Sequence, residues 1–513
     1  MVNDYEIFNS WLYKDYTDDV PSKIINIFEN EKIPKRWIIA ATKIVHRLSE
    51  TPWYTQEQLY KETLLKKEDL ISLNSYIRDS DFLQEMMVHR GLGRKYWNTM
   101  IPYVKSDRIG KVLDYEYDFP LRLAFFPGIS CMYYCGFCGR NQTASYDTNQ
   151  VLQSGIQRYK DIISDLPKNS TISISGGLEP LTNLRLGEII TYAKSLGHRV
   201  PLITNGHMLT PSYLKKQSGI WDLDSLRVSL YGVDEESTYF VTRHPKAYKL
   251  VKNNIIEFLL ERNRRNSNVK VGLNYVIIPE NVNTVLSLID YIYEINSKVN
   301  NGNGIDFLTL RDDYGSVTDD DEKDGLDRKY SLNEFLTEND RKKLIKIFKE
   351  FNVKQKNKCP NLHVDYGYAM VSLGDGIFGK PLARVDGKQM RKSGFPQLSV
   401  AIDSAGDVFL YREAGFLDRQ GNDKFIAGRI PNGGTLEKVL KKFVGDKKII
   451  DLDYDDSKFM DSYDHLITLL VNQAEQDLNF GIPFDIGPVK VRGGNQDNLN
   501  ITLSNNWYRD EKN

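Results

Sequence analysis

The stretch GISCMYYCGFCGR, residues 128–140, carries three of the four cysteines in this 513-residue chain. These three, Cys131, Cys135 and Cys138, have the spacing CxxxCxxC. Neighbouring thiols can be disulfide partners, zinc ligands, redox thiols or ligands of an iron–sulfur cluster. Which of these roles applies decides both the fold and the chemistry of the chain.

The odd number of clustered thiols favours the iron–sulfur role. A disulfide would leave one thiol unpaired and would need an oxidising compartment. Structural zinc takes four ligands, but the fourth cysteine, Cys359, is distant in sequence and no histidine is near the cluster. A redox pair at Cys135 and Cys138 would be expected in a small redox domain. A [4Fe–4S] cluster held by three thiolates keeps its fourth iron open to an external ligand.

The composition is that of a soluble globular protein, with 41% hydrophobic and 27% charged residues. The net charge of −1 provides no overall basic field, so we expect neither nucleic acid nor a membrane as a partner. No apolar run approaches the roughly 18 residues that span a bilayer. The N-terminus lacks a signal-peptide pattern, and the cysteines are few. We therefore predict a cytoplasmic protein.

Strand-like and helical segments alternate after the cysteine motif. The helical segments are about 151–164, 184–196, 211–217, 246–263 and 283–298. Such alternation predicts βα units and a parallel sheet, with the chemistry on loops at the carboxyl ends of the strands. The predicted strands are 121–126, 171–175, 198–206, 225–232, 268–278 and 304–310.

The flanks suggest three parts. Residues 1–115 contain helical patterns such as PKRWIIAATKIVHRL and are predicted to form an N-terminal helical domain. Residues 116–315 would form the α/β core. Residues 316–513 would form an α+β extension over the substrate, with a β-hairpin in 395–416 around the turn DSAGD.

The cysteine motif, with an aromatic residue just before its last cysteine, resembles the signature of the radical S-adenosylmethionine (radical SAM) superfamily. The resemblance implies a partial (βα)6 barrel and one [4Fe–4S] cluster on Cys131, Cys135 and Cys138. It also implies SAM as a cosubstrate bound to the open iron and cleaved reductively to methionine and a 5′-deoxyadenosyl radical. A reductant such as flavodoxin or ferredoxin would supply the electron.

Three further motifs match SAM-binding positions of this superfamily. SGGLEP is similar to the GGEP motif, whose backbone binds the amino group of SAM, although Leu178 is inserted. RVSLYG matches the fourth strand, which contacts the ribose or carboxylate, and GLNYVIIPEN matches the fifth strand, which packs against the adenine. The implied SAM-binding residues are Gly176, Gly177, Glu179, Ser229 and Asn274.

Longer stretches, among them SGGLEPLTN, IDFLTLRDDYG, LHVDYGYA and GDVFLYREAGF, resemble the radical SAM ammonia-lyases of nucleotide-linked deoxyaminosugars. This resemblance covers most of the chain from about residue 95. It implies deamination of a nucleotide-diphosphate-linked deoxyaminosugar to a keto-deoxysugar. Cationic side chains suit the diphosphate, because a guanidinium matches phosphate bidentately. The candidates are Arg311, Arg391, Lys392 and Arg412 for the anion, and Asp312, Tyr366 and Glu413 as catalytic residues near the sugar.

Two alternatives remain open from the sequence. A radical SAM dehydrogenase or epimerase of a nucleotide sugar or aminoglycoside would start from the same radical. A non-enzymatic iron–sulfur sensor would hold a cluster without cleaving SAM, and the SAM-site motifs weigh against it. An auxiliary cluster is excluded, because Cys359 is the only further cysteine.

Overall fold

The computed structural model describes residues 33–50, 54–81, 107–140, 144–299, 304–312, 336–367, 370–374 and 385–483, with a few single positions between 25 and 103. The chain divides into two compact units. The first comprises residues 1–109 and 469–492, and the second comprises 110–468 and 493–513. The three-part division expected from the sequence stays a prediction.

The second unit is built on one sheet of ten strands, in the order β10-β9-β8-β1-β2-β3-β4-β5-β6-β7. The strands are β1 (Arg122–Phe126), β2 (Ile172–Ile174), β3 (Pro201–Thr204), β4 (Ser225–Leu230), β5 (Lys270–Ile277), β6 (Phe307–Asp312), β7 (His363–Tyr366), β8 (Ser399–Asp403), β9 (Asp407–Phe409) and β10 (Ile426–Arg429). Strands β1 to β6 are parallel neighbours in sequence order. The predicted partial (βα)6 barrel is confirmed, and each of its six predicted strands is present.

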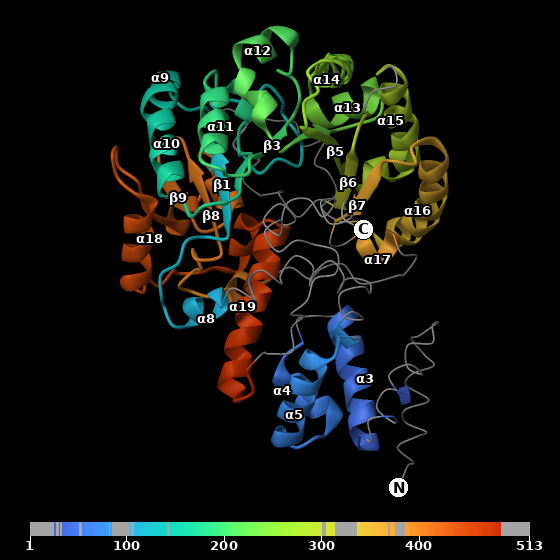
Figure 1. Ribbon diagram of the computed structural model, residues 1–513, viewed down its shortest axis with the longest axis vertical. Helices are drawn as coiled ribbons and strands as arrows, with labels where there is room; N and C mark the ends of the chain where they lie inside the picture. Colours follow the sequence, from blue (N-terminus) through green and yellow to red (C-terminus); the bar gives the residue numbers. More distant parts are fainter. Residues whose placement is uncertain are drawn as a thin grey trace. The chain divides into compact units, whose positions relative to one another are not determined.

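The helices between β1 and β7 lie along the outer side of the sheet (Figure 1). Helix α10 shows why these helices pack on the sheet. Its apolar residues recur at helical spacing and are all buried: Ile156, Tyr159, Ile162 and Ile163. The described helices from residue 108 onward are α8 (Arg108–Leu113), α9 (Thr148–Gln150), α10 (Ile156–Asp165), α11 (Leu186–Ser195), α12 (Pro211–Lys216), α13 (Glu235–Thr242), α14 (Ala247–Arg264), α15 (Leu288–Ser297), α16 (Glu338–Lys358), α17 (Val371–Gly374), α18 (Leu436–Gly445) and α19 (Ser462–Phe480).

The predicted C-terminal hairpin is present as β8 and β9, which pair antiparallel. It does not form a separate layer. Strand β8 pairs parallel with β1 from Arg122↔Ser399 to Phe126↔Asp403, so the hairpin extends the barrel sheet at its first strand. Residues that follow β9 are thereby brought to the carboxyl ends of the barrel strands.

The first unit is helical in its described part. It contains α3 (Lys35–Glu50), α4 (Gln56–Thr63), α5 (Lys67–Asp79) and the C-terminal portion of α19. A capping box between Thr55 and Gln58 starts α4, and the buried Asp477 of α19 accepts a hydrogen bond from the Gln56 amide at 2.6 Å. None of the described helices is long and apolar enough to cross a membrane.

Candidate active site

A cavity lies at the carboxyl ends of the parallel strands, where loops are expected to carry chemistry. It contains about 1230 Å³ of space, part of it open to solvent. Its wall combines the cysteine loop after β1, the turn after β2, the ends of β3 to β6 and the segment that follows β9. This is ample room for a cofactor together with a small substrate.

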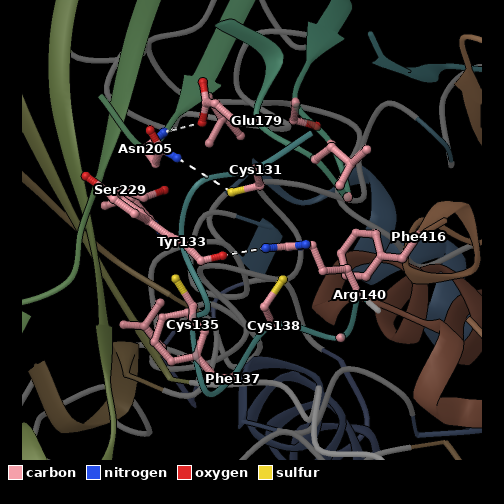
Figure 2. A pocket seen from close by; sticks show the side chains of 18 of the residues that line it. Cys131, Tyr133, Cys135, Phe137, Cys138, Arg140, Glu179, Asn205, Ser229 and Phe416 are labelled. Carbon is pink, nitrogen blue, oxygen red and sulfur yellow. Dashed lines mark hydrogen bonds between the residues drawn. The ribbon is translucent and has the colours of Figure 1, made fainter. Parts of the chain in front are cut away.

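The cysteine loop brings Cys131, Cys135 and Cys138 to this one cavity as free thiols. Figure 2 shows the three sulfur atoms around a common space. The loop is anchored by backbone hydrogen bonds, among them Tyr134 N–H to the Thr242 carbonyl at 3.0 Å. Another runs from the Cys138 N–H to the Cys135 carbonyl at 3.0 Å.

Burial raises the pKa of the Cys131 thiol to about 11, and burial also raises the pKa values of Cys135 and Cys138. The guanidinium of Arg140 opposes this effect at all three thiols. Arg140 is buried and donates a hydrogen bond to the Tyr133 carbonyl (Figure 2). A nearby cation stabilises thiolates, which are the form that binds iron.

A cluster fits these residues better than one metal ion does. Within the described residues, no three His, Cys, Asp or Glu side chains converge on the position of a single ion. The three thiols instead surround a shared space beside a buried cation, and Phe137 lines the same cavity. Three soft sulfur donors in such a setting match a [4Fe–4S] cluster, in which each thiolate binds a different iron.

Glu179 joins the turn after β2 to the end of β3. Its carboxylate accepts hydrogen bonds from the Leu181 amide at 3.0 Å, the Thr204 hydroxyl at 2.5 Å and the Asn205 amide at 2.8 Å. Burial raises the pKa of Glu179 to about 7. Because the carboxylate is occupied by these contacts, Glu179 lines the cavity mainly as a residue that fixes the turn.

The two glycines of the same turn also line the cavity. Gly176 approaches the Leu178 carbonyl, and Gly177 packs against Phe416 from the segment after β9. On the preceding loop, a side chain at Gly128 would meet the Glu179 carbonyl, so the two loops pass close together. The turn therefore presents no side chain of its own at Gly176 or Gly177, and the ring of Phe416 occupies the space beside Gly177.

Ser229 and Asn274 are neighbours in register on β4 and β5, and both line the cavity. The row continues through Thr309 of β6 and Asp365 of β7, because Asn274 pairs with Thr309 and Thr309 with Asp365. Side chains at paired positions of a parallel sheet share a face. The inner face of the barrel thus carries a polar row at the level of Ser229.

Three of the predicted substrate residues form a charged part of the wall: Arg311, Arg412 and Glu413. Arg412 donates to the Ser175 hydroxyl at 2.8 Å and pairs with Asp461 at 3.4 Å, so its guanidinium is already engaged. Arg311, at the carboxyl-terminal end of β6, is exposed. Burial raises the pKa of Glu413, and Arg419 at 3.7 Å opposes the shift.

The other predicted residues are not brought to this wall. Tyr366 donates a hydrogen bond to Asn352 of α16 at 2.7 Å and packs against Phe348. Arg391 is buried against Ser393 and the Val112 carbonyl, while Lys392 is exposed elsewhere. Of Asp312 the structure describes the backbone at the end of β6, and its side chain lies outside the described residues.

Several residues of the wall were not predicted from the sequence. Asn205 follows β3 directly, and its position after a strand end was a usable signal. Tyr231 lies just beyond β4, within the motif that singled out Ser229. Phe416 and Asp461 come from segments distant in sequence, and no local pattern could have placed them beside the cysteines.

Comparison with known proteins agrees with this geometry. Residues 126–292 match the model of the radical SAM superfamily. The chain is 34% identical over 396 residues to the dTDP-4-amino-4,6-dideoxy-D-glucose ammonia-lyase of Streptomyces venezuelae, covering 76% of this chain and 78% of that protein. It is 30% identical over 118 residues to the AdoMet-dependent heme synthase of Methanosarcina barkeri, covering 23% and 33% of the two chains.

Among solved structures, Streptococcus suis SuiB bound to S-adenosylmethionine matches with a TM-score of 0.40 and 16% identity, over 70% of this chain and 72% of that one. A score this low carries no argument of its own. The family model and the long match to the ammonia-lyase are sufficient to assign the superfamily. The chain therefore belongs to the radical SAM superfamily, as an enzyme of the lyase type that uses a [4Fe–4S] cluster and SAM and shares its family with dTDP-4-amino-4,6-dideoxy-D-glucose ammonia-lyase.

Proposed function

We propose that this enzyme removes ammonia from a nucleotide-diphosphate-linked deoxyaminosugar and leaves a keto-deoxysugar. The observation that carries the proposal is the 34% identity to an ammonia-lyase of this substrate type over 396 residues. A match over 76% of this chain extends well beyond residues 126–292, which the superfamily model covers.

In this proposal, Cys131, Cys135 and Cys138 each bind one iron, and the fourth iron is left for SAM. The backbone of Gly176 and Gly177 faces the amino group of SAM, while Ser229 and Asn274 contact its ribose and adenine side. Glu179 holds the glycine turn in place through its three hydrogen bonds. When bound, the cluster and SAM together supply a 5′-deoxyadenosyl radical by one-electron reductive cleavage of SAM.

The substrate then passes through three changes whose atoms and electrons balance. It gives one hydrogen atom from the carbinol carbon to the deoxyadenosyl carbon. The C–N bond of the neighbouring amine-bearing carbon breaks, and ammonia leaves. One further electron from the external reductant and one proton then add to the sugar radical, which ends as a ketone. The sugar undergoes no net oxidation, so a single cluster suffices.

Arg311 is the proposed contact for the diphosphate, because it is a cation exposed at the cavity. Arg412 shapes the same region while holding Ser175 and Asp461. Glu413 is the proposed acid–base group at the sugar, because it is a carboxyl group of the cavity wall and burial raises its pKa. Asp312 remains a candidate beside Arg311. We assign no substrate contact to Tyr366, Arg391 or Lys392.

The electron donor in this proposal is a small carrier such as flavodoxin or ferredoxin, and the enzyme works in the cytoplasm. Ferredoxin carries a low-potential iron–sulfur cluster and flavodoxin carries a flavin, and either can deliver one electron at a time. The net charge of −1 gives no overall positive field that would attract nucleic acid.

The test is a single assay on the anaerobically reconstituted enzyme. Reductant, SAM and a panel of nucleotide-linked aminosugars are combined, and mass spectrometry follows 5′-deoxyadenosine and sugar products. We expect a keto-deoxysugar and free ammonia in equal amounts. A ketone that keeps its amine would make the enzyme a dehydrogenase, and an unchanged mass with inverted configuration would make it an epimerase.

A further inference from the structure

The side-chain amide of Asn205 contacts the sulfur atoms of two neighbouring residues of the cysteine loop. Its nitrogen donates to the Cys131 sulfur at 3.8 Å and to the Met132 sulfur at 3.1 Å. An amide nitrogen carries two N–H groups, so both contacts form at once. Figure 2 shows the contact with Cys131, and Asn205 itself lines the cavity.

The backbone fixes the orientation of this amide. The Oδ1 atom of Asn205 accepts a hydrogen bond from the His207 N–H at 2.9 Å. If the amide were turned over, its NH2 group would face another donor, so the hydrogen-bond network assigns the nitrogen to the side of the sulfurs. A thiolate that binds iron has no proton and only accepts hydrogen bonds, which requires the same orientation.

The turn after β2 holds Asn205 from its backbone side. The Asn205 N–H donates to the Glu179 carboxylate at 2.8 Å, and the Glu179 N–H donates to the Ser130 carbonyl at 3.0 Å. Asn205 is buried and follows directly on the end of β3. A buried side chain held in this way has little freedom to turn away from Cys131, so its donor is in place before the cluster binds.

Hydrogen bonds to the sulfurs of an iron–sulfur cluster help set its reduction potential. Reduction adds one negative charge to a buried group, and burial penalises that charge. A donor aimed at a sulfur stabilises the reduced state more than the oxidised state, because charge-assisted hydrogen bonds are the stronger ones. Such a donor therefore raises the potential, which makes the cluster easier to reduce.

We propose that Asn205 is a positioning residue that raises the reduction potential of the cluster through its hydrogen bond to Cys131. The inference rests on the proposed binding of iron by Cys131. It assigns Asn205 to the electron-transfer step that precedes SAM cleavage and gives it no contact with the sugar.

The experiment measures the midpoint potential of Asn205→Ser in the reconstituted full-length enzyme. A serine hydroxyl accepts from the His207 N–H in the same kind of turn, but it is too short to reach the Cys131 sulfur. Iron content and the ultraviolet–visible spectrum first establish that the variant holds one cluster. A redox titration without SAM or sugar, followed by electron paramagnetic resonance, should then show the equilibrium constant of reduction falling about threefold to tenfold, which is roughly 30–60 mV for a one-electron couple.

Met132→Leu is the matched control. It removes the other sulfur that the amide of Asn205 contacts, keeps about the same volume, and leaves the donor to Cys131 in place. We expect its midpoint potential to equal that of the wild type. The comparison therefore separates the hydrogen bond at Cys131 from a general disturbance of the cysteine loop.

An unchanged midpoint in Asn205→Ser, a shift to more positive potential, or equal shifts in Asn205→Ser and Met132→Leu would overturn the proposal. A folded Asn205→Ser protein unable to hold a cluster would also overturn it, because a donor that only tunes the potential is not needed for assembly. If Asn205→Ser does not fold, Asn205→Leu removes the donor at similar volume, and the same criteria apply to its midpoint.

The underlying assignment of Cys131 has a separate readout. Cys131→Ala should lose the cluster altogether, as judged by iron content. If that variant kept a full cluster, the proposed iron ligation would fail. A loss of the cluster in Cys131→Ala together with an unchanged Asn205→Ser midpoint would reject the tuning role alone.

Discussion

A Cβ atom on Gly177 would lie 2.6 Å from Cδ1 of Phe416 and 3.0 Å from its Cα atom. Gly177 belongs to the turn after β2, whereas Phe416 lies beyond β9, more than 200 residues later. The contact exists because β8 pairs with β1 and carries the hairpin to the start of the barrel. The segment after the hairpin therefore presses directly on the backbone proposed to bind SAM.

Replacing Gly177 with alanine should weaken SAM binding and spare the cluster. The added methyl group forces Phe416 or the turn to move, and overpacking of this kind costs about 1–3 kcal/mol. We expect the dissociation constant of SAM to rise about tenfold in an equilibrium binding experiment on the reconstituted enzyme. Iron content should equal that of the wild type.

Two further variants sharpen this comparison. Gly445→Ala is the matched control, because a Cβ at Gly445 would have no atom within 4 Å. The double variant Gly177→Ala with Phe416→Ala should recover part of the lost affinity. If the double variant bound SAM as poorly as the single one, Phe416 would not be the cause.

The cysteines should divide cleanly into three that hold the cluster and one that does not. Cys359 is buried at the end of α16, within the hydrophobic core, and does not line the cavity. Cys359→Ala should keep about one cluster per chain and lose some thermal stability, because it removes a buried side-chain atom. Cys131→Ala, Cys135→Ala and Cys138→Ala should each lose it, as measured by iron and sulfide analysis. A cluster-free Cys359→Ala protein that still folds would contradict this division.

The six barrel strands, the hairpin and the cysteine loop could be predicted because their signals are local. Short runs rich in apolar residues mark these strands, and the motif CxxxCxxC marks the loop. The pairing of β8 with β1 could not be predicted, because it joins residues about 280 positions apart. Phe416 and Asp461 reach the cavity wall through that pairing and the elements that follow it, so they were missed.

The substrate-binding residues were harder to predict, because the sequence does not show which side chains of a strand face the cavity. Successive side chains of a strand point to opposite faces. On β7, Asp365 pairs with Thr309 in the inner polar row, so its neighbour Tyr366 faces α16. From the sequence, Tyr366 was named as a candidate near the sugar, and Asp365 was not considered. Arg391 likewise matched a phosphate-binding residue type, although it is buried against Ser393.

Asp403 should make stability fall as the pH rises. Burial raises its pKa from 3.8 to about 6, although hydrogen bonds from the Tyr146 hydroxyl at 2.6 Å and the Asp407 amide at 2.9 Å oppose the shift. The folded chain thus binds this proton more tightly than the unfolded chain does. The contribution is greatest below a pH of about 4 and is lost as the pH rises through about 6.

Asp403→Asn removes this titration. As the pH rises from about 5 to about 7, the free energy of unfolding of the variant should increase relative to that of the wild type by on the order of 1 kcal/mol. Thermal unfolding of the cluster-free proteins at several pH values measures the difference. A constant difference between the two proteins over that range would show that Asp403 does not titrate there.

Arg311 should contribute to substrate affinity without supporting the fold, unlike two other arginines. Its side chain is exposed at the cavity, so Arg311→Ala should raise the dissociation constant of the nucleotide sugar about tenfold to a few hundredfold, the scale of a charge-assisted hydrogen bond of roughly 1.5–3 kcal/mol. The melting temperature of Arg311→Ala should stay unchanged.

Arg412→Ala should lose both substrate affinity and stability, because it also removes the hydrogen bond to Ser175 and the ion pair with Asp461. Arg391→Ala, outside the cavity wall, should lose stability alone. Calorimetric titration and thermal unfolding separate the three variants, and normal binding by Arg311→Ala would move the diphosphate elsewhere.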